Sequence, residues 1–170
     1  MDVLTAQSKV EDKTYMGFEQ RQMVILLLYL TAASWQDMKK KSIGGWTFLL
    51  AAGAAVLDWA AYVFAEGGEV PFVSLAAGCG IGSVLLLLGK ISDGAIGEGD
   101  GWSFVVTGII LGVWRNTELL FYGMMIGGSY AAGVFCWGKV HGKDLGKRTF
   151  PWIPCILPAG IWIAWKGMTG

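Results

Sequence analysis

Two aspartates have the settings best suited to catalysis in this chain. Asp100 ends the segment Gly97-Glu98-Gly99-Asp100, directly before an apolar run that begins near Trp102. The glycines at 97 and 99 leave the backbone free to fold tightly, which would bring the carboxylate close to the main chain of a substrate. Asp37 lies at the end of another apolar run. Each acid alone could simply mark a membrane boundary. A catalytic role therefore depends on whether the fold brings the two side chains close together.

Two carboxylates that meet can perform general acid–base catalysis. They cannot easily both ionise, so they share a proton and titrate as a coupled pair. The ionised group can take a proton from water while the protonated group polarises a peptide carbonyl, which is how aspartic proteases cut an amide bond. No Ser-His-Asp pattern competes with this prediction, because His141 is the only histidine and lies in a polar loop.

Neither a metal nor a disulfide is predicted. The three cysteines are isolated in or beside apolar runs and no Cys-x-x-Cys pair is present, so we expect free thiols packed as small apolar residues. We also expect no cofactor. The cysteines are Cys79, Cys136 and Cys155.

The composition is that of an integral membrane protein. Hydrophobic residues make up 54% of the 170 residues and charged residues only 15%, which is too apolar for an ordinary soluble domain of this length. The 13 basic and 13 acidic residues balance, so nucleic acid is not an implied partner. The implied surroundings are a lipid bilayer.

The apolar residues form continuous runs near the length of about 20 residues that a bilayer core requires. Continuous runs exclude a β-barrel, whose strands alternate, and a helix satisfies its own backbone in lipid. We therefore expect an all-α membrane protein. A polar N-terminal tail, residues 1–21, would precede a bundle of about six transmembrane helices within residues 22–170. The runs are 19–37 at its fullest extent, 46–65, 72–89, 102–114, 119–137 and 152–165.

The distribution of lysine and arginine predicts the orientation of this bundle. The loops after the first, third and fifth runs carry most of the basic residues, which places them in the cytoplasm and both termini outside. Asp37 and Asp100 would then lie on one cytoplasmic face. The basic residues of these loops are Lys39, Lys40, Lys41, Lys90, Lys139, Lys143, Lys147 and Arg148.

Three segments resemble the type IV prepilin peptidase family, intramembrane aspartic proteases of the Gly-x-Gly-Asp class. They are Asp37 followed by Ser42-Ile43-Gly44, the Gly97–Asp100 segment, and the run from Lys147 to Pro154. The resemblance implies a multi-pass protein of the cytoplasmic membrane. Asp37 and Asp100 would be catalytic, with Gly97 and Gly99 as the supporting motif.

The substrate that the resemblance implies is a prepilin or pseudopilin-like membrane protein. The cut would fall at the cytoplasmic face, between a short basic leader and a hydrophobic helix. Some family members also methylate the new N-terminus with S-adenosylmethionine, and no motif here carries that activity over.

The sequence departs from the family pattern in three places. Ile43-Gly44-Gly45 stands where Ile-Pro-Asn is common, and Trp102 stands where a lysine usually follows the second aspartate. The missing lysine removes a positive charge near the pair. The large cysteine-paired cytoplasmic domain of longer members is also missing, so we expect a minimal form.

Other charged residues have simpler interpretations. Asp58 lies inside an apolar run, where an acid is a candidate functional residue, but Trp59 and Tyr62 beside it favour a position at the outer interface. Asp93 and Glu98 share the loop of Asp100 and are interpreted as solvated. The basic loop 139–148 could bind anionic headgroups or serve only to set topology.

Small residues at 78–82 and 123–127 have the spacing of close helix contacts, which we interpret as packing seams inside the bundle. One alternative function stays open: a small proton- or ion-coupled transporter, or a subunit of a membrane complex, in which the same acids carry protons or ions.

Overall fold

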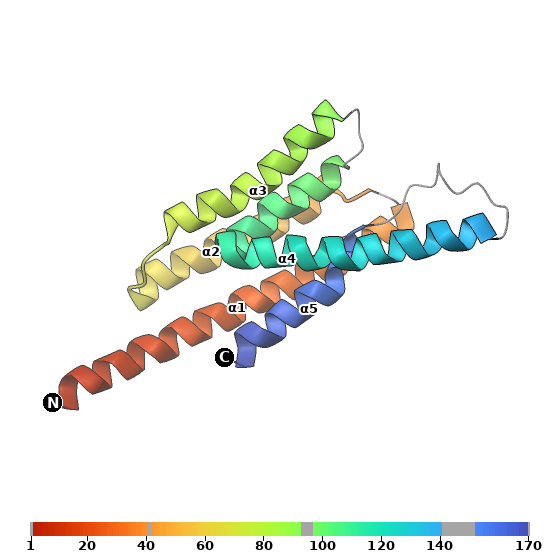
Figure 1. Ribbon diagram of the computed structural model, residues 1–170. Helices are drawn as coiled ribbons and strands as arrows, with labels where there is room; N and C mark the ends of the chain where they lie inside the picture. The colour runs from red at the N-terminus through yellow and green to blue at the C-terminus, as the bar shows by residue number, and fades with distance from the viewer. Residues whose placement is uncertain (1, 41, 93–96, 141–151, 170) are drawn as a thin grey trace.

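Five α-helices make up the computed structural model, and no strand occurs in the residues it describes, which are 2–40, 42–92, 97–140 and 152–169. Figure 1 shows the helices lying alongside one another. The predicted all-α class is therefore confirmed. The helices are α1 (Asp2–Lys40), α2 (Gly45–Glu66), α3 (Phe72–Ile91), α4 (Glu98–Val140) and α5 (Ile153–Thr169).

Three of these helices are long and apolar enough to cross a membrane: α2, α3, and α4 over Glu98–Trp137. These apolar helices support a membrane protein, and the number of about six transmembrane helices stays a prediction. α5 has only 17 residues, which at 1.5 Å per residue is shorter than a bilayer core of about 30 Å. α1 begins with the polar residues that were predicted as a tail, and these are helical from Asp2 onward.

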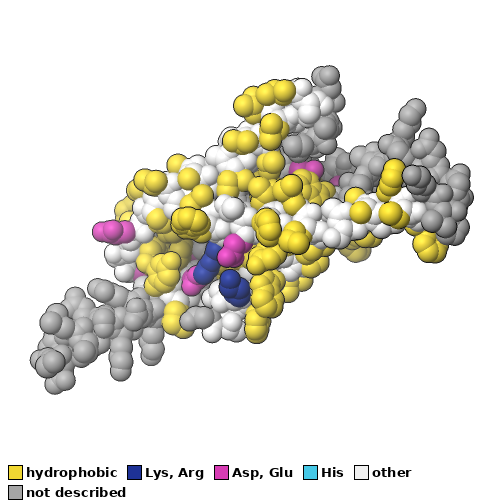
Figure 2. Space-filling view, in the orientation of Figure 1, with side chains coloured by type: hydrophobic (Ala, Val, Ile, Leu, Met, Phe, Trp, Pro, Cys, Tyr) yellow, Lys and Arg dark blue, Asp and Glu magenta, His cyan; other side chains and the backbone are white. Residues whose placement is uncertain are grey.

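The outer faces of the apolar helices suit a lipid environment. Large apolar side chains are widely exposed, among them Phe64 at 89%, Val73 at 85% and Trp114 at 82%. Figure 2 shows the same character on one face of the molecule, where hydrophobic side chains cover most of the described surface and charged ones gather in a few places. An apolar surface of this extent is expected where lipid, not water, surrounds the protein.

α4 folds back on itself at Gly112. This residue has φ 66° and ψ −173°, a conformation inside the helix that favours glycine. The side chain of Asn116 donates a hydrogen bond of 3.0 Å to the carbonyl of Phe104. In a straight helix these two residues would be about 18 Å apart along the axis. α4 therefore consists of a first arm, residues 98–111, and a second arm, residues 113–140 (Figure 1).

The break at Gly112 changes the predicted connection between the fourth and fifth apolar runs. Those runs, 102–114 and 119–137, fall mainly on the first and second arms. The polar residues between them, which the sequence pattern indicated as a loop, are instead helical. A single residue makes the reversal.

The short connections place helix ends together. The end of α1, the start of α2, the end of α3 and the start of α4 lie at one end of the molecule, and the α2–α3 connection and the Gly112 break lie at the other (Figure 1). Gln36 fastens the first connection, because its amide accepts a hydrogen bond from the backbone of Gly44 at 2.8 Å and donates one to Thr47 at 2.7 Å. Gly67 ends α2 in the left-handed conformation, with φ 70°.

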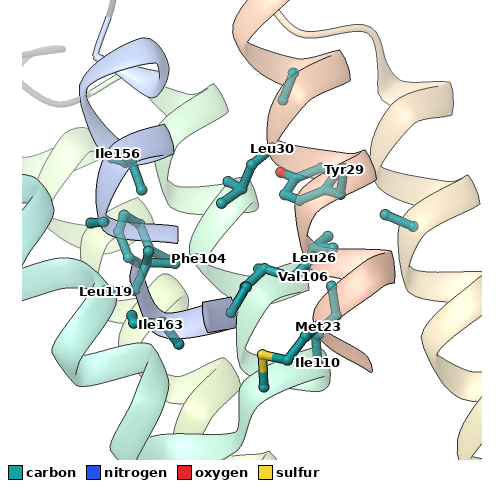
Figure 3. Packing of buried hydrophobic residues seen from close by; sticks show 14 of the residues in the cluster. Met23, Leu26, Tyr29, Leu30, Phe104, Val106, Ile110, Leu119, Ile156 and Ile163 are labelled. Carbon is teal, nitrogen blue, oxygen red and sulfur yellow. The ribbon is translucent and has the colours of Figure 1, made fainter. Parts of the chain in front are cut away.

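The core lies between α1, α5 and both arms of α4 (Figure 3). Its α1 side chains recur every three or four residues, which places them on one face of the helix. Those of α5 follow the same spacing. Both helices are therefore central although neither qualifies as a spanning segment by length and composition. The buried side chains include Met23, Leu26, Leu30 and Ala33 of α1 and Ile156, Ala159 and Ile163 of α5.

Glycines bring α3 and the first arm of α4 into backbone contact. A methyl group added at Gly82 would lie 2.7 Å from the carbonyl oxygen of Gly101, and one at Gly108 would lie 2.6 Å from that of Gly78. No side chain larger than hydrogen fits at either position. The predicted packing seam at 78–82 is thus confirmed as a contact within the chain.

The second predicted seam lies between α4 and α5. A methyl group added at Gly123 would lie 3.0 Å from Ile156, and one at Gly127 would lie 2.8 Å from the indole nitrogen of Trp152. The small residues at 123–127 therefore allow the second arm of α4 to approach the start of α5.

The fully buried Asn116 links the second arm of α4 by hydrogen bonds to the first arm and to α3. Its amide nitrogen donates to the carbonyls of Gly78 in α3 and Phe104 in the first arm, both at 3.0 Å. Its amide oxygen accepts a hydrogen bond of 2.7 Å from the hydroxyl of Thr107. This network explains how a polar side chain just after the Gly112 break is accommodated inside the molecule.

Candidate functional site

Asp37 lies in the last turn of α1 and is partly buried. One of its carboxylate oxygens accepts a hydrogen bond of 3.3 Å from the backbone N–H of Ile153, the first residue of α5. The N-terminus of a helix carries a partial positive charge and unpaired N–H groups, so it favours a neighbouring anion. Asp37 therefore links the end of α1 to the beginning of α5.

Asp100 lies in the first turn of α4, and α2 and α3 separate it in sequence from Asp37. Its own N–H donates to the carbonyl of Gly97 at 3.0 Å, and the N–H of Gly101 donates to the same oxygen at 3.3 Å. This turn starts the helix and fixes the backbone that carries the carboxylate. Asp100 is partly buried.

The two glycines of the motif differ in how much room the structure leaves for a larger side chain. A methyl group added at Gly97 would lie 3.1 Å from a carboxylate oxygen of Asp100, so a larger residue there would crowd the acid. One added at Gly99 would lie 3.8 Å from Ile43, which is ordinary contact. On steric grounds the structure therefore demands a glycine more strongly at 97 than at 99.

The structure brings Asp37 and Asp100 together. Their carboxylates are close enough to interact electrostatically, although they come from α1 and α4. Cys155 of α5, partly buried, also lies within electrostatic range of Asp37. The site is thus built from the end of α1, the start of α4 and the start of α5, at the end of the molecule where α2 begins and α3 ends.

A tyrosine and a serine that sequence reasoning missed lie beside this pair. The hydroxyl of Tyr29 is near Ser103 and within electrostatic range of Asp100. Tyr29 is only 3% exposed, and none of the described residues satisfies its hydroxyl with a well-formed hydrogen bond. Ser103 donates its own hydroxyl proton to the carbonyl of Gly99 at 2.8 Å. Figure 3 shows Tyr29 at the edge of the core on α1.

Helical spacing was the signal that could have found both residues. Tyr29 precedes Asp37 by eight residues, close to two helical turns, and Ser103 follows Asp100 by three. Each therefore lies on the same face of its helix as the acid. Ser34, buried with its hydroxyl oxygen unpaired among the described residues, precedes Asp37 by three and extends the polar face of α1.

A groove of about 330 Å³ lies between α1 and α2, next to this site. It begins at Gln36 and Thr47, close to Asp37 in sequence, and continues along apolar side chains. Tyr29 lines it as well, so the groove and the two acids share a residue. Its apolar lining comprises Ile25, Leu28, Ala32, Leu50, Ala51 and Ala54.

Ion pairs between described residues lie toward the far end of the molecule. Asp58 receives a hydrogen bond of 2.6 Å from Arg21 and one of 3.0 Å from Gln22, so it is a paired acid on α2. Arg21 also pairs with Glu66 at 2.9 Å. Arg115 of α4 also pairs with Glu19 of α1, and Lys166 of α5 pairs with Glu118 of α4. None of these groups belongs to the site of Asp37 and Asp100.

Several residues singled out in the sequence lie outside the described residues. Asp93, His141 and the segment 143–148 of the basic loop are among them. Glu98 is described and is exposed. Over the residues that the structure does describe, no group of three or more His, Cys, Asp or Glu side chains could hold a metal ion.

No family model matches the sequence, and no curated protein and no solved structure matches the chain. Any reaction assigned to the site must therefore be argued from its residues and their geometry. Two interacting carboxylates beside a buried hydroxyl and a helix N-terminus can divide the roles of acid and base toward a water molecule.

Proposed function

We propose that this chain is an intramembrane aspartic endopeptidase of the prepilin peptidase type. The observation that carries the proposal is that Asp37 and Asp100, which come from separate helices, lie within electrostatic range of each other. Two acids that hold one water molecule between them share a proton and can activate that water. The three segments that resemble the prepilin peptidase family add to this support.

The environments of the two acids assign them different roles. The hydrogen bond from Ile153 and the start of α5 favour the ionised form of Asp37. Asp37 is therefore the base that takes a proton from water. Asp100, in the first turn of α4, is assigned the role of the acid that protonates the peptide carbonyl. The start of α5 then supplies the positive potential that a lysine at position 102 would have provided.

The tyrosine hydroxyl completes the proposed site. As water attacks the peptide carbonyl, negative charge develops on the carbonyl oxygen, and a donor placed in advance stabilises that charge. Tyr29 lies beside Asp100 and Ser103 with its hydroxyl unpaired among the described residues. It is the donor available for that oxygen.

The groove between α1 and α2 is the proposed binding site for the hydrophobic helix of the substrate. Its apolar lining matches such a segment, and its polar end at Gln36 and Thr47 lies toward the acids. A precursor whose basic leader precedes a hydrophobic helix would then place the junction of the two at the catalytic pair. The substrate class is therefore a prepilin or pseudopilin-like membrane protein.

The charges at the two ends of the molecule support an active site facing the cytoplasm. Lys39 and Lys40 end α1 and Lys90 ends α3, all at the catalytic end. At the far end, Arg21 and Arg115 each pair with an acid. An excess of lysine and arginine in short loops favours the cytoplasmic side, so we place the protein in the cytoplasmic membrane with the pair at its inner face.

Cleavage of a pilin-like precursor tests the proposal. Purified protein is incubated with the precursor, and the experiment is repeated with Asp37→Asn and Asp100→Asn. Asparagine keeps the size of the side chain and can still accept the hydrogen bond from Ile153, so both variants should fold. Because general acid–base catalysis contributes about 10²- to 10⁴-fold, each variant should lose at least about 100-fold in rate.

Glu98→Gln is the matched control, since Glu98 is an exposed acid of the same motif. It should cut at the wild-type rate. If Asp37→Asn or Asp100→Asn cuts as fast as the wild type, the assignment of the catalytic pair is wrong.

A second candidate function, proton- or ion-coupled transport, has one observation in its favour. α1 carries three buried polar atoms without a hydrogen-bond partner among the described residues, on Gln22, Tyr29 and Ser34. However, the seven residues from Gln22 to Tyr29 correspond to about 10 Å of helix, too far for a proton to pass between them directly. The fully buried Leu26 lies within that interval. Proton flux in liposomes without any cleavage would favour the transporter.

A further inference from the structure

The polar end of the groove between α1 and α2 holds a hydroxyl whose hydrogen is unused. Thr47, in the first turn of α2, lines this end and is partly exposed. Its oxygen accepts a hydrogen bond of 2.7 Å from the amide nitrogen of Gln36. Its own hydrogen is donated to no other described residue. The hydroxyl is therefore free to donate to a group that enters the groove.

Three other threonines of the described helices donate their hydrogen back to their own helix. Thr31, Thr117 and Thr169 each bond to the carbonyl four residues earlier, at 2.7 to 2.8 Å, as threonines inside helices commonly do. Thr47 comes too early in α2 for such a bond, because Ile43, four residues before it, precedes the helix. The position of Thr47 at the start of α2 explains why its hydroxyl keeps a donor to spare.

Gln36 fixes the direction of this hydroxyl. Its amide oxygen accepts the backbone N–H of Gly44 at 2.8 Å, so its nitrogen must face Thr47. A hydroxyl that accepts a hydrogen bond on one side directs its own hydrogen elsewhere. Each bond in such a chain also polarises the next one. Gln36 is therefore a positioning residue, and Thr47 is a donor oriented before any substrate binds.

A membrane helix that is to be cut needs such a donor. Along α1 the groove runs from Ile25 to Gln36, eleven residues, or about 16 Å, which matches about three turns of a bound helix. At the catalytic end the substrate backbone must leave its helix, because a helix spends its carbonyl groups on its own N–H groups. Lipid offers no donor to the carbonyls that are freed. The enzyme has to supply one there.

We propose that the hydroxyl of Thr47 binds a backbone carbonyl of the substrate where the substrate leaves its helix. Because Gln36 directly precedes Asp37 in the chain, the carbonyl belongs to one of the first three residues on the helix side of the cut. This inference rests on the proposed peptidase function. It adds to that function the group that selects a substrate able to unwind at the cut.

Cleavage kinetics of the full chain in detergent test the role of Thr47. Thr47→Val removes the hydroxyl at almost the same shape. It should raise KM about 2- to 10-fold and leave kcat unchanged, because a hydrogen bond made equally in the bound substrate and in the transition state contributes to binding alone. Thr47→Ser keeps the hydroxyl and should restore the lower KM. Thr31→Val is the matched control, since Thr31 is exposed on α1 and does not line the groove.

A change in the substrate backbone separates binding from a merely structural role of Thr47. Precursors are made with an ester bond after the first, second or third residue on the helix side of the cut, because an ester carbonyl is a weaker acceptor than an amide carbonyl. One of these esters should raise KM for the wild type and for Thr31→Val, and should have little further effect on Thr47→Val.

The outcomes distinguish this inference from the function on which it rests. If the wild type cuts no precursor, the proposed peptidase function fails and the role of Thr47 fails with it. If the wild type cuts, but every ester raises KM as much for Thr47→Val as for the wild type, Thr47 does not bind the substrate backbone. In that case the assignment of Asp37 and Asp100 stands.

Discussion

Replacing Gly82 by alanine should disturb the catalytic end of the molecule from a neighbouring helix. The added methyl group would lie 2.7 Å from the carbonyl oxygen of Gly101, the residue after Asp100. It would also lie only 2.3 Å from the backbone nitrogen of Val105, and ordinary contact begins at 3.4 Å, so α3 and the first arm of α4 must separate by about 1.1 Å. The obstacle is backbone, which cannot turn aside as a side chain can.

Gly82→Ala should lower both the stability of the protein and its cleavage rate. Overpacking of this kind costs about 1–3 kcal/mol, partly offset by up to about 1 kcal/mol from the helix propensity of alanine. A misplacement of about 1 Å can reduce catalysis by roughly 100-fold. If the proposed peptidase activity is correct, Gly82→Ala should therefore cut precursor roughly 10- to 100-fold more slowly while still folding.

Gly80→Ala is the matched control, because a methyl group there would meet nothing within 4 Å. Thermal unfolding in detergent and the cleavage rate are measured for both variants. Gly80→Ala should match or slightly exceed the wild type in stability and retain its rate. If Gly82→Ala behaves like Gly80→Ala in both measurements, the close backbone contact between α3 and α4 does not position Asp100.

Three further predictions concern the hydrogen bonds and acids described above. Asn116→Ala should lower the free energy of unfolding by about 2 kcal/mol, since hydrogen bonds inside membrane proteins average about 0.6 kcal/mol and three are lost; Thr117→Ala, at an exposed position, should change it little in the same unfolding assay. Tyr29→Phe should slow cleavage about 100-fold without loss of stability, because the hydroxyl it removes has no partner among the described residues; an unchanged rate would exclude the hydroxyl from the reaction. The cleavage rate measured against pH should fall on both sides of an optimum, as a shared proton requires, and a flat profile in single-turnover experiments would contradict the roles assigned to Asp37 and Asp100.

The sequence pattern predicted the helical class and the meeting of the two acids at one end, because both follow from local features. Continuous apolar runs indicate helices, and alternation of direction along the chain brings the end of the first run and the start of the fourth to the same side. The resemblance to a peptidase family and the activity stay predictions. So does the division into a tail, residues 1–21, and a membrane domain, although α1 is helical across that boundary.

The position of the turn between the fourth and fifth apolar runs was wrong because the polar residues 115–118 were interpreted as a loop, whereas the chain reverses at Gly112. Arg115 and Asn116 follow the Gly112 break, yet one pairs with Glu19 and the other is buried among backbone carbonyls. Their partners come from segments distant in sequence, and a hydropathy pattern does not contain that information. Tyr29 was missed although its helical spacing from Asp37 can be read in the sequence; its position beside Asp100, on another helix, cannot.

The hydrogen bond between Asp37 and the start of α5 has a consequence for biosynthesis. A ribosome makes α5 more than a hundred residues after Asp37, so the base of the proposed pair meets its donor only once α5 has been translated. A nascent protease that is incomplete in this way would be unable to cut its neighbours in the translocation machinery. Activity would begin with the docking of α5, which makes assembly itself the activating event.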